Sequence, residues 1–382
     1  MELKSESPLT QIMTRRNEGF AALRAALTLL VVFHHTAITY GAIGGWFYRE
    51  VPTDTSLTST LLVFFCTVNQ AFFMGLFFLL AGYYTPSAMQ RKGSLRFLVD
   101  RLLRLGLPLL VFGWGLGPVT IALAQTHRGQ PFTSTLMYLW SKGTFENGPL
   151  WFAQALLIFS LGATLLATWV QSDWTRVPSM NSQASEFPSD LKVAILALGT
   201  GAAALALRSV WPVGVNIWGL QLGYFASYVV LFAVGCIAAR PHWLERLPKA
   251  RVQIWWRVGL IALPVLPITY FLGGAVPELR GHVLDVVYAF WEPFVACGMI
   301  ILLLDRFQHH FVTLESFWRP LARRAYTIYI VHPPVLVAVA LAWRDVPVNP
   351  MLKFAVTGSV TCAVCFLIAG WLVRLPGVRR VL

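Results

Sequence analysis

The feature that most constrains the fold is an apolar run from Phe20 to Tyr40 that carries an arginine and two histidines. A helix needs about 20 apolar residues, at ~1.5 Å rise each, to cross a bilayer, so this run is long enough to span. Arg24 and His35 are separated by about three helical turns, which places both side chains on one face of the helix. His35 then lies ~16 Å deeper than Arg24, near the middle of the membrane.

The composition extends this interpretation to the whole chain. Hydrophobic residues make up 57% of the sequence and charged residues only 12%, whereas soluble domains typically have about 25% charged residues. We therefore expect an all-α, polytopic transmembrane bundle, with a cytosolic segment over 1–19, a transmembrane domain over 20–373 and a cytosolic tail over 374–382. The ten candidate spans are 20–40, 59–84, 104–124, 149–170, 192–208, 220–239, 255–273, 283–304, 325–343 and 352–373. The fifth of them, 192–208, is the shortest and is rich in alanine and glycine.

The distribution of lysine and arginine predicts the orientation of the chain. With the N-terminus in the cytosol, 23 of the 30 Lys and Arg residues fall in inner segments and 7 in outer loops. This asymmetry follows the positive-inside rule and predicts that both termini are cytosolic. The net charge of +13 then belongs to loops that face anionic lipid, and it requires no nucleic-acid partner. The longest polar stretch, 171–191, is expected to be a mobile cytosolic loop.

His35 has two interpretations. Ionisable groups near the middle of a bilayer are costly and usually mark a polar pathway or a reactive site. His35 is either a general base at the end of a hydrophilic cavity, where burial favours the neutral form that a base requires, or a residue that hydrogen-bonds a neighbouring helix and holds the bundle together. His34 lies about 100° around the helix, off the face of Arg24, and is interpreted as a packing residue.

Two further ionisable residues are expected within the membrane. His332 lies ~12 Å past Arg324 in the ninth span, and we expect Pro333 and Pro334 to break the helix after it. Such a break persists only where protein or a wet cavity satisfies the freed carbonyls, so the segment is either part of the site or an architectural kink. Glu292, in the eighth span, either orients a histidine or carries a proton, or it forms an ion pair with an arginine.

A basic segment stands at the entrance to the third span. Its cations either anchor the chain at the inner surface or clamp the phosphates of an anionic cytosolic ligand, because guanidinium groups match phosphate bidentately. Arg101 and Arg104 are three positions apart and share one helical face. The segment contains Arg91, Lys92, Arg96, Arg101 and Arg104.

Other classes of site find little support in the sequence. All five cysteines lie in apolar runs, and the CxxC spacing of Cys362 and Cys365 has no second ligand pair, so we expect no metal. The chain has no phosphate-binding loop, zinc-protease motif or nucleophile elbow, and the glycine-rich GAIGGW at 41–46 follows no strand. A proton-coupled secondary transporter or flippase, with His35, His332 and Glu292 as a relay, is the alternative class. The two halves of the chain show no repeat to support it.

Several segments together resemble the acyltransferase 3 family of polytopic membrane acyltransferases, over about residues 17–370. The resemblance implies that Arg24 and His35 match the family's arginine and essential catalytic histidine. It also implies that Arg101 and Arg104 match its cytosolic arginine pair, which is associated with the acyl-CoA donor. The segments are ALRAALTLLVVFHH in the first span, FFMGLFFLLAGYY in the second, RLLRLGLPLL at the third, GPLWFAQALLIF in the fourth and YTIYIVHPP in the ninth.

The resemblance also implies a reaction. Family members transfer an acyl group, commonly acetyl or succinyl, from acyl-CoA to a hydroxyl of a cell-envelope or secreted glycan, or of a lipid-linked or small-molecule acceptor. Acyl-CoA is then a donor substrate, no cofactor is tightly bound, and the location is a bacterial-type inner membrane. We group Arg24, His35, Glu292 and His332 as candidate catalytic residues, and Arg96, Arg101 and Arg104 as candidate donor-binding residues. The chain departs from the family pattern at Ala81, where many relatives have serine, and at Gln154, where relatives often have a carboxylate.

Overall fold

The computed structural model describes residues 8–170, 186–275, 281–309 and 315–378. Most of the loop expected over 171–191 therefore lies outside the described residues. Within them the chain is all-helical and has no β-strand. Ten helical segments are long and apolar enough to cross a membrane, which confirms the predicted number of spans, including the fifth. The segments are Glu18–Thr39, Leu57–Lys92, Ser94–Arg128, Gly148–Trp169, Asp190–Val210, Leu222–Ala239, Lys249–Leu272, His282–His309, Ala325–Ala342 and Pro350–Leu372.

The longer helices of the first half extend past the apolar runs that predicted them. The first two spans belong to α1 (Pro8–Thr39) and α2 (Leu57–Lys92). The third begins at Ser94 rather than at 104, as α3 (Ser94–Arg101), α4 (Leu107–Val111) and α5 (Gly117–Gln125), which are joined by single π-helical turns. Hydropathy detects only the part of a helix that lies in hydrocarbon, so the polar turns at its end were missed. The remaining helices of this half are α6 (Phe132–Ser141) and α7 (Trp151–Val170).

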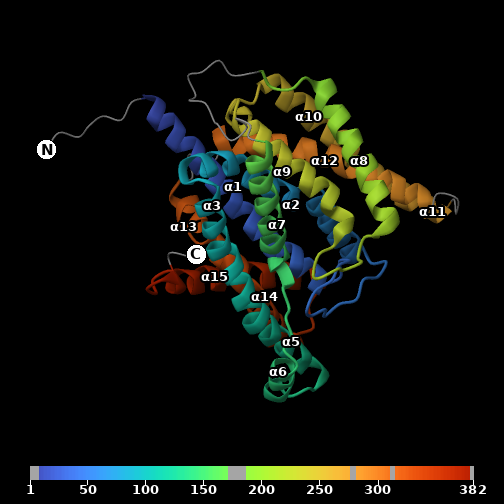
Figure 1. Cartoon of the computed structure of the whole chain (residues 1–382). Helices are drawn as coiled ribbons and strands as arrows, with labels where there is room; N and C mark the ends of the chain where they lie inside the picture. The colour runs from blue at the N-terminus through green and yellow to red at the C-terminus, as the bar shows by residue number, and fades with distance from the viewer. Residues whose placement is uncertain (1–7, 171–185, 276–280, 310–314, 379–382) are drawn as a thin grey trace.

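The second half contains α8 to α15. Figure 1 shows α8, α10 and α12 gathered on one side of the bundle and α13, α14 and α15 on the other, with α1 and α2 between them. The bounds are α8 (Asp190–Val210), α9 (Phe225–Ala239), α10 (Lys249–Ala262), α11 (Val265–Ala275), α12 (His282–His309), α13 (Glu315–Ala322), α14 (Ala325–Ala342) and α15 (Pro350–Leu372).

The expected break of the ninth span at Pro333 and Pro334 is wrong, because α14 remains helical from Ala325 to Ala342. Each proline removes one backbone donor, but the helix is held by packing on α1, α5 and α15. The seventh span is interrupted instead. There α10 ends at Ala262 and α11 begins at Val265, with Pro264 between them.

Close packing of α2 on α9 depends on two glycines. A Cβ atom on Gly82 would lie 2.1 Å from the carbonyl oxygen of Phe232, and one on Gly235 would lie 2.1 Å from the carbonyl oxygen of Leu79. Small residues of this kind let helix backbones approach closely in a membrane, where packing has to replace the hydrophobic effect. The two helices form the most extensive helix pair of the described structure.

The central position of α1 sets the location of the candidate site. This helix packs against α2, α12, α13, α14 and α15 (Figure 1). Residues from Phe20 to Val32 contribute to the largest hydrophobic core of the described chain. The face of α1 that carries His35 meets α14 near His332, so the two predicted intramembrane histidines come together.

Candidate active site

The centre of the candidate site is a hydrogen bond between two histidines that are far apart in the sequence. His35 Nδ1 lies 3.0 Å from His332 Nε2, and the two rings are nearly parallel, at an interplanar angle of 4°. His332 is fully buried, whereas His35 is partly exposed. Of the two rings, therefore, only that of His35 retains exposed surface.

The partners of the two rings define which nitrogen carries each proton. His332 Nδ1 lies 2.7 Å from the carbonyl oxygen of Tyr329, and a carbonyl only accepts, so Nδ1 is the protonated nitrogen of a neutral His332. Its Nε2 is then an acceptor, and the Nδ1–H of His35 donates a hydrogen bond to it. The remaining nitrogen of His35, Nε2, is left with a lone pair. The arrangement therefore presents His35 Nε2 as a base.

The proline after His332 helps to build this arrangement. In a regular helix the backbone N–H of residue 333 would donate to the carbonyl of Tyr329, but Pro333 has no N–H. The freed carbonyl oxygen accepts the ring proton of His332 instead. Since a carbonyl left unpaired in hydrocarbon is costly, the exchange both satisfies the helix and fixes the tautomer of His332.

Trp46 covers the histidine pair. Its indole ring stacks on His35 with ring centroids 4.0 Å apart and an interplanar angle of 9°, and it also stacks over His332 at 5.9 Å. The indole lies in the glycine-rich segment that follows the first span. A tryptophan face is the side-chain surface that best stabilises an adjacent cation, so it favours the protonated form of His35 when that form appears.

The connection that carries Trp46 is tied to the neighbouring helices by buried polar contacts. Glu50 forms an ion pair with Lys353 of α15, and both side chains are almost completely buried. The hydroxyl of Tyr40 lies 2.9 Å from the Thr357 hydroxyl, and the Ser59 hydroxyl donates to the carbonyl of Gly41 at 2.7 Å. Anchors at both ends hold Trp46 over the histidines.

His34 has the packing role that its position predicts. Its ring stacks on Phe73 of α2, with centroids 5.0 Å apart, and it meets the ring of His35 edge to face at 5.7 Å.

Arg24 is exposed although its neighbours Leu23 and Ala25 are buried. Its guanidinium lies 5.7 Å from the ring centroid of Tyr84. Arg24 and Arg104 are both close enough to Arg101 for electrostatic repulsion. Arg101 and Arg104 thus lie with Arg24 at one end of the bundle, and this basic end lies about three helical turns from His35.

The donor-binding candidates lie on an irregular helix. Arg101 ends α3, where its guanidinium lies 5.1 Å from the ring centroid of Phe97, and Arg104 lies inside the π-helical turn Leu102–Gly106. π-helical turns are frequent at functional sites. Arg96, two turns before Arg104, is exposed on α3.

Glu292 lies in a different polar cluster. It forms an ion pair with Arg208 of α8, and both side chains are buried. The Arg208 guanidinium also donates to the carbonyl of Gly223 at 3.0 Å and lies over the rings of Tyr224 and Tyr288, at 5.5 and 4.7 Å. Of the alternatives that the sequence left open for Glu292, the structure contains the ion pair with an arginine. It does not bring Glu292 to the histidine pair. A relay through His35, His332 and Glu292 is therefore not assembled in the described residues.

The two departures from the family pattern also have defined surroundings. Gln154 accepts a hydrogen bond from Asn147 at 2.8 Å and donates to the carbonyl of Trp218 at 3.2 Å. It therefore ties α7 to the connection between α8 and α9. Ala81 directly precedes Gly82 on α2, where the helix packs closely on α9.

Ten helical segments that are long and apolar enough to cross a membrane, with a histidine pair inside the bundle, are typical of an integral membrane protein. A family model described as an acyltransferase domain matches residues 17–370, nearly the whole chain. The chain thus belongs to the acyltransferase 3 family, and it is a membrane acyltransferase in the general sense of that family. No curated protein and no solved structure matches it.

Three residues of these polar clusters escaped the sequence analysis. Trp46 lay in a glycine-rich segment that was considered only as a possible nucleotide loop. Arg208 and Lys353 are among the seven cations assigned to outer loops, although each pairs with a buried carboxylate. A useful signal was available for Lys353, because it lies inside the apolar run of the tenth span and a lysine there requires a partner.

Proposed function

We propose that this protein transfers an acyl group, of the acetyl or succinyl type, from cytosolic acyl-CoA to a hydroxyl of a glycan, a lipid-linked acceptor or a small molecule. The bacterial-type inner membrane is the location that fits such a reaction. The observation that carries the proposal is the hydrogen bond between His35 and His332, because it leaves Nε2 unprotonated on a ring that is partly exposed.

The proposed reaction begins with proton removal. His35 Nε2 takes the proton of the acceptor hydroxyl as the hydroxyl oxygen attacks the thioester carbonyl, a contribution of ~10²–10⁴ in rate. The new C–O bond forms first, and the C–S bond then breaks. The proton on His35 passes to the departing thiolate, so that the products are the ester and free coenzyme A, and the base is regenerated.

The neighbours of His35 support both stages. His332 Nε2 accepts a hydrogen bond from the Nδ1–H of His35 throughout, which holds the His35 ring in one orientation and one tautomer. When His35 is protonated, the face of Trp46 stabilises its positive charge. Arg24, with Arg101 and Arg104, supplies positive charge for the phosphates of the donor or for developing negative charge.

The length of α1 suits a donor that enters from the basic end. Arg24 and His35 are ~16 Å apart along the helix. The pantetheine arm of coenzyme A is an extended chain of about a dozen single and amide bonds and can span a distance of that order. Phosphates held at the arginines then leave the thioester near His35.

The proposal is tested by acyl transfer in cells. Cells that produce the wild-type protein are compared with cells that produce His35→Ala, by mass spectrometry of envelope glycans and secreted metabolites. We expect acyl mass increments with the wild type and none with H35A. His309→Ala, exposed at the end of α12, is the matched control and should keep the product. Transfer that persists in a folded, membrane-inserted H35A protein would refute the proposal.

Binding of the donor is measured separately on purified protein. Acetyl-CoA or succinyl-CoA should raise the melting temperature of the wild type, because a ligand that binds only the folded state stabilises it. Replacing Arg101 and Arg104 with alanine should abolish this shift. Uptake driven by an ion gradient in vesicles, without stabilisation by acyl-CoA, would favour the transporter instead.

A further inference from the structure

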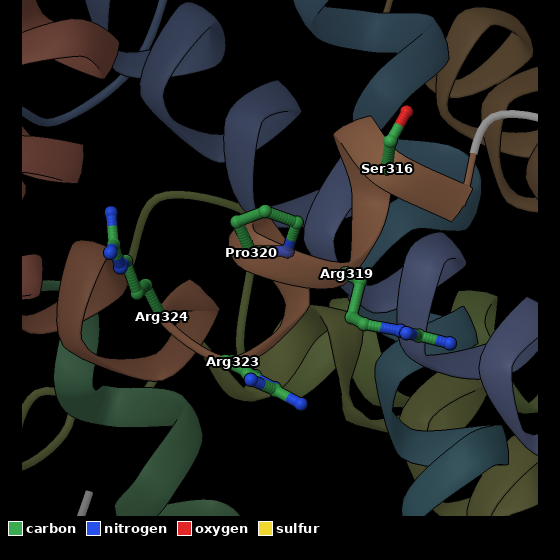
Figure 2. Close-up of a pocket in the computed structure, with 5 residues that line it drawn as sticks. All are labelled: Ser316, Arg319, Pro320, Arg323 and Arg324. Carbon is green, nitrogen blue, oxygen red and sulfur yellow. The ribbon is translucent and has the colours of Figure 1, made fainter.

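A pocket with a volume of about 380 Å³ lies where α13 meets α14. Its size is within the range of small-molecule sites, and the reaction described above uses none of its residues. Figure 2 shows the side chains of Arg319 and Arg323 extending to one side of the connection between the two helices, and that of Arg324 extending to the other. The lining residues are Ser316, Arg319, Pro320, Arg323 and Arg324.

The pocket carries an excess of positive charge. Arg319 forms an ion pair with Glu18 of α1 at 3.0 Å. Arg323 is exposed. Arg324 lies 4.1 Å from the ring centroid of Phe366, and Gly370 leaves room for it, since a Cβ there would approach the guanidinium carbon to 3.0 Å. None of the residues that line the pocket is a carboxylate, so the site is suited to an anion with more than one negative charge.

The position of the pocket relates it to the donor-binding arginines. Tyr326, two residues after Arg324, donates its hydroxyl proton to the backbone carbonyl of Arg104 at 2.8 Å. In the other direction, His332 follows Arg324 by eight residues of continuous helix, which is ~12 Å along α14. The pocket therefore adjoins the helix of Arg104 and lies within reach of the histidine pair for a ligand with an extended arm.

We propose that this pocket binds nucleotide phosphates of the acyl-CoA donor, an inference that rests on the proposed function. Coenzyme A carries a 5′-diphosphate and a separate phosphate on the ribose 3′-oxygen, so its negative charges lie at two positions. The guanidinium groups of the pocket match one of these positions, and Arg101 and Arg104, on the adjoining helix, match the other. The pantetheine arm is longer than the ~12 Å to His332, and the thioester reaches His35 from there.

A phospholipid headgroup offers similar chemistry, and the experiment separates the two ligands. The full-length protein is placed in nanodiscs of zwitterionic lipid, and binding of coenzyme A and of dephospho-coenzyme A, which lacks the 3′-phosphate, is measured. The response to anionic lipid is the change in melting temperature when an anionic phospholipid is included in the nanodiscs. The variants are Arg323→Ala and Arg324→Ala, with Arg324→Lys to keep the charge without the guanidinium fork. The matched control is Arg240→Ala, an exposed arginine at the C-terminal end of α9.

We expect each alanine variant to weaken coenzyme A binding about tenfold or more, as loss of a charged hydrogen bond does. Arg324→Lys should give a smaller loss, and Arg240→Ala none. If one of these two arginines binds the 3′-phosphate, its alanine variant should also bind coenzyme A and dephospho-coenzyme A with equal affinity. If Arg324→Ala does not fold, Arg323→Ala alone decides.

Unchanged coenzyme A binding in both alanine variants would overturn the inference. So would variants whose only defect is a lost response to anionic lipid, because the pocket would then hold a headgroup. Either result leaves the proposed acyl transfer intact if the wild type still binds coenzyme A and still yields a product that depends on His35. Failure of the wild type to bind any coenzyme A thioester would instead remove the proposed function itself.

Discussion

At the scale of single residues, the basicity of His35 depends on a chain of donors and acceptors that ends on a backbone carbonyl. The chain runs from His35 Nδ1 to His332 Nε2, and from His332 Nδ1 to the carbonyl of Tyr329. Each neutral ring has one donor and one acceptor nitrogen, and the carbonyl only accepts, so the whole chain has a single arrangement of protons when both rings are neutral.

His332→Phe tests this chain, because phenylalanine keeps a planar ring but has neither ring nitrogen. We expect the turnover rate to fall about 10²-fold, while the KM for acyl-CoA changes little, since the donor is held at the distant basic end. The check is the initial rate of acyl transfer by purified protein, with the acceptor that the mass spectrometry described above identifies. A large rise in KM with unchanged turnover would contradict the assigned role.

Trp46 is tested by a pair of substitutions. Trp46→Phe keeps an aromatic face over His35, whereas Trp46→Ala removes it. A cation–π contact is worth about 0.5–2 kcal/mol, so the alanine variant should react about 2- to 30-fold more slowly and the phenylalanine variant should fall between it and the wild type. Equal rates for the two variants would show that the face of the ring has no part in the reaction.

At the scale of the element, α14 lacks backbone hydrogen bonds at its two prolines, and one of the freed carbonyls binds the ring of His332. Two successive prolines remove two backbone donors from the helix, yet the helix continues. The carbonyl freed by Pro333 belongs to Tyr329 and accepts a hydrogen bond from the Nδ1–H of His332. The carbonyl freed by Pro334 belongs to Ile330.

Pro333→Ala and Pro334→Ala separate these two effects. Both restore a backbone donor, and each should stabilise the helix by up to ~3 kcal/mol. Only Pro333→Ala supplies a donor that competes with His332 for the Tyr329 carbonyl, so only this variant should lose activity severalfold. Thermal unfolding and initial rates, measured on both proteins, distinguish the cases. A fully active Pro333→Ala protein would contradict the argument that the hydrogen bond to the Tyr329 carbonyl fixes the tautomer of His332.

At the scale of the whole molecule, two buried polar clusters lie in different parts of the bundle. The histidine pair joins α1 to α14, and the ion pair of Arg208 and Glu292 joins α8 to α12. Figure 1 shows α8 and α12 on the side of the molecule opposite α14 and α15. This separation predicts that the ion pair acts on stability and the histidine pair on reactivity.

Arg208→Met leaves the Glu292 carboxylate buried without its partner, which should cost ~3–5 kcal/mol of folding free energy. The double variant, with Glu292→Met as well, should recover most of this loss, because the two apolar side chains replace both charges. We expect the double variant to retain acyl transfer close to the wild-type rate. A folded double variant without transfer activity would support a catalytic Glu292, as the sequence analysis had allowed.

The number of spans could be predicted because each span depends only on a continuous run of apolar residues. About 20 consecutive apolar residues suffice to define a transmembrane helix, whatever its neighbours. The limits of helices were less predictable. The third span extends ten residues before its predicted start, since the turns that carry Arg96 and Arg101 are polar and give no hydropathy signal.

For the candidate site, the apolar runs alone are enough to mark His35, His332 and Glu292 as exceptional, because the cost of burying an ionisable group follows from its position within such a run. The partners of these residues depend on how the helices pack. His35 meets His332 across 297 positions of sequence, and Glu292 meets Arg208 across 84, because these distances are set by helix packing and by no local pattern. Shape complementarity between helices, such as that of Gly82 and Gly235, selects which faces meet, and only then does an isolated imidazole become an oriented base.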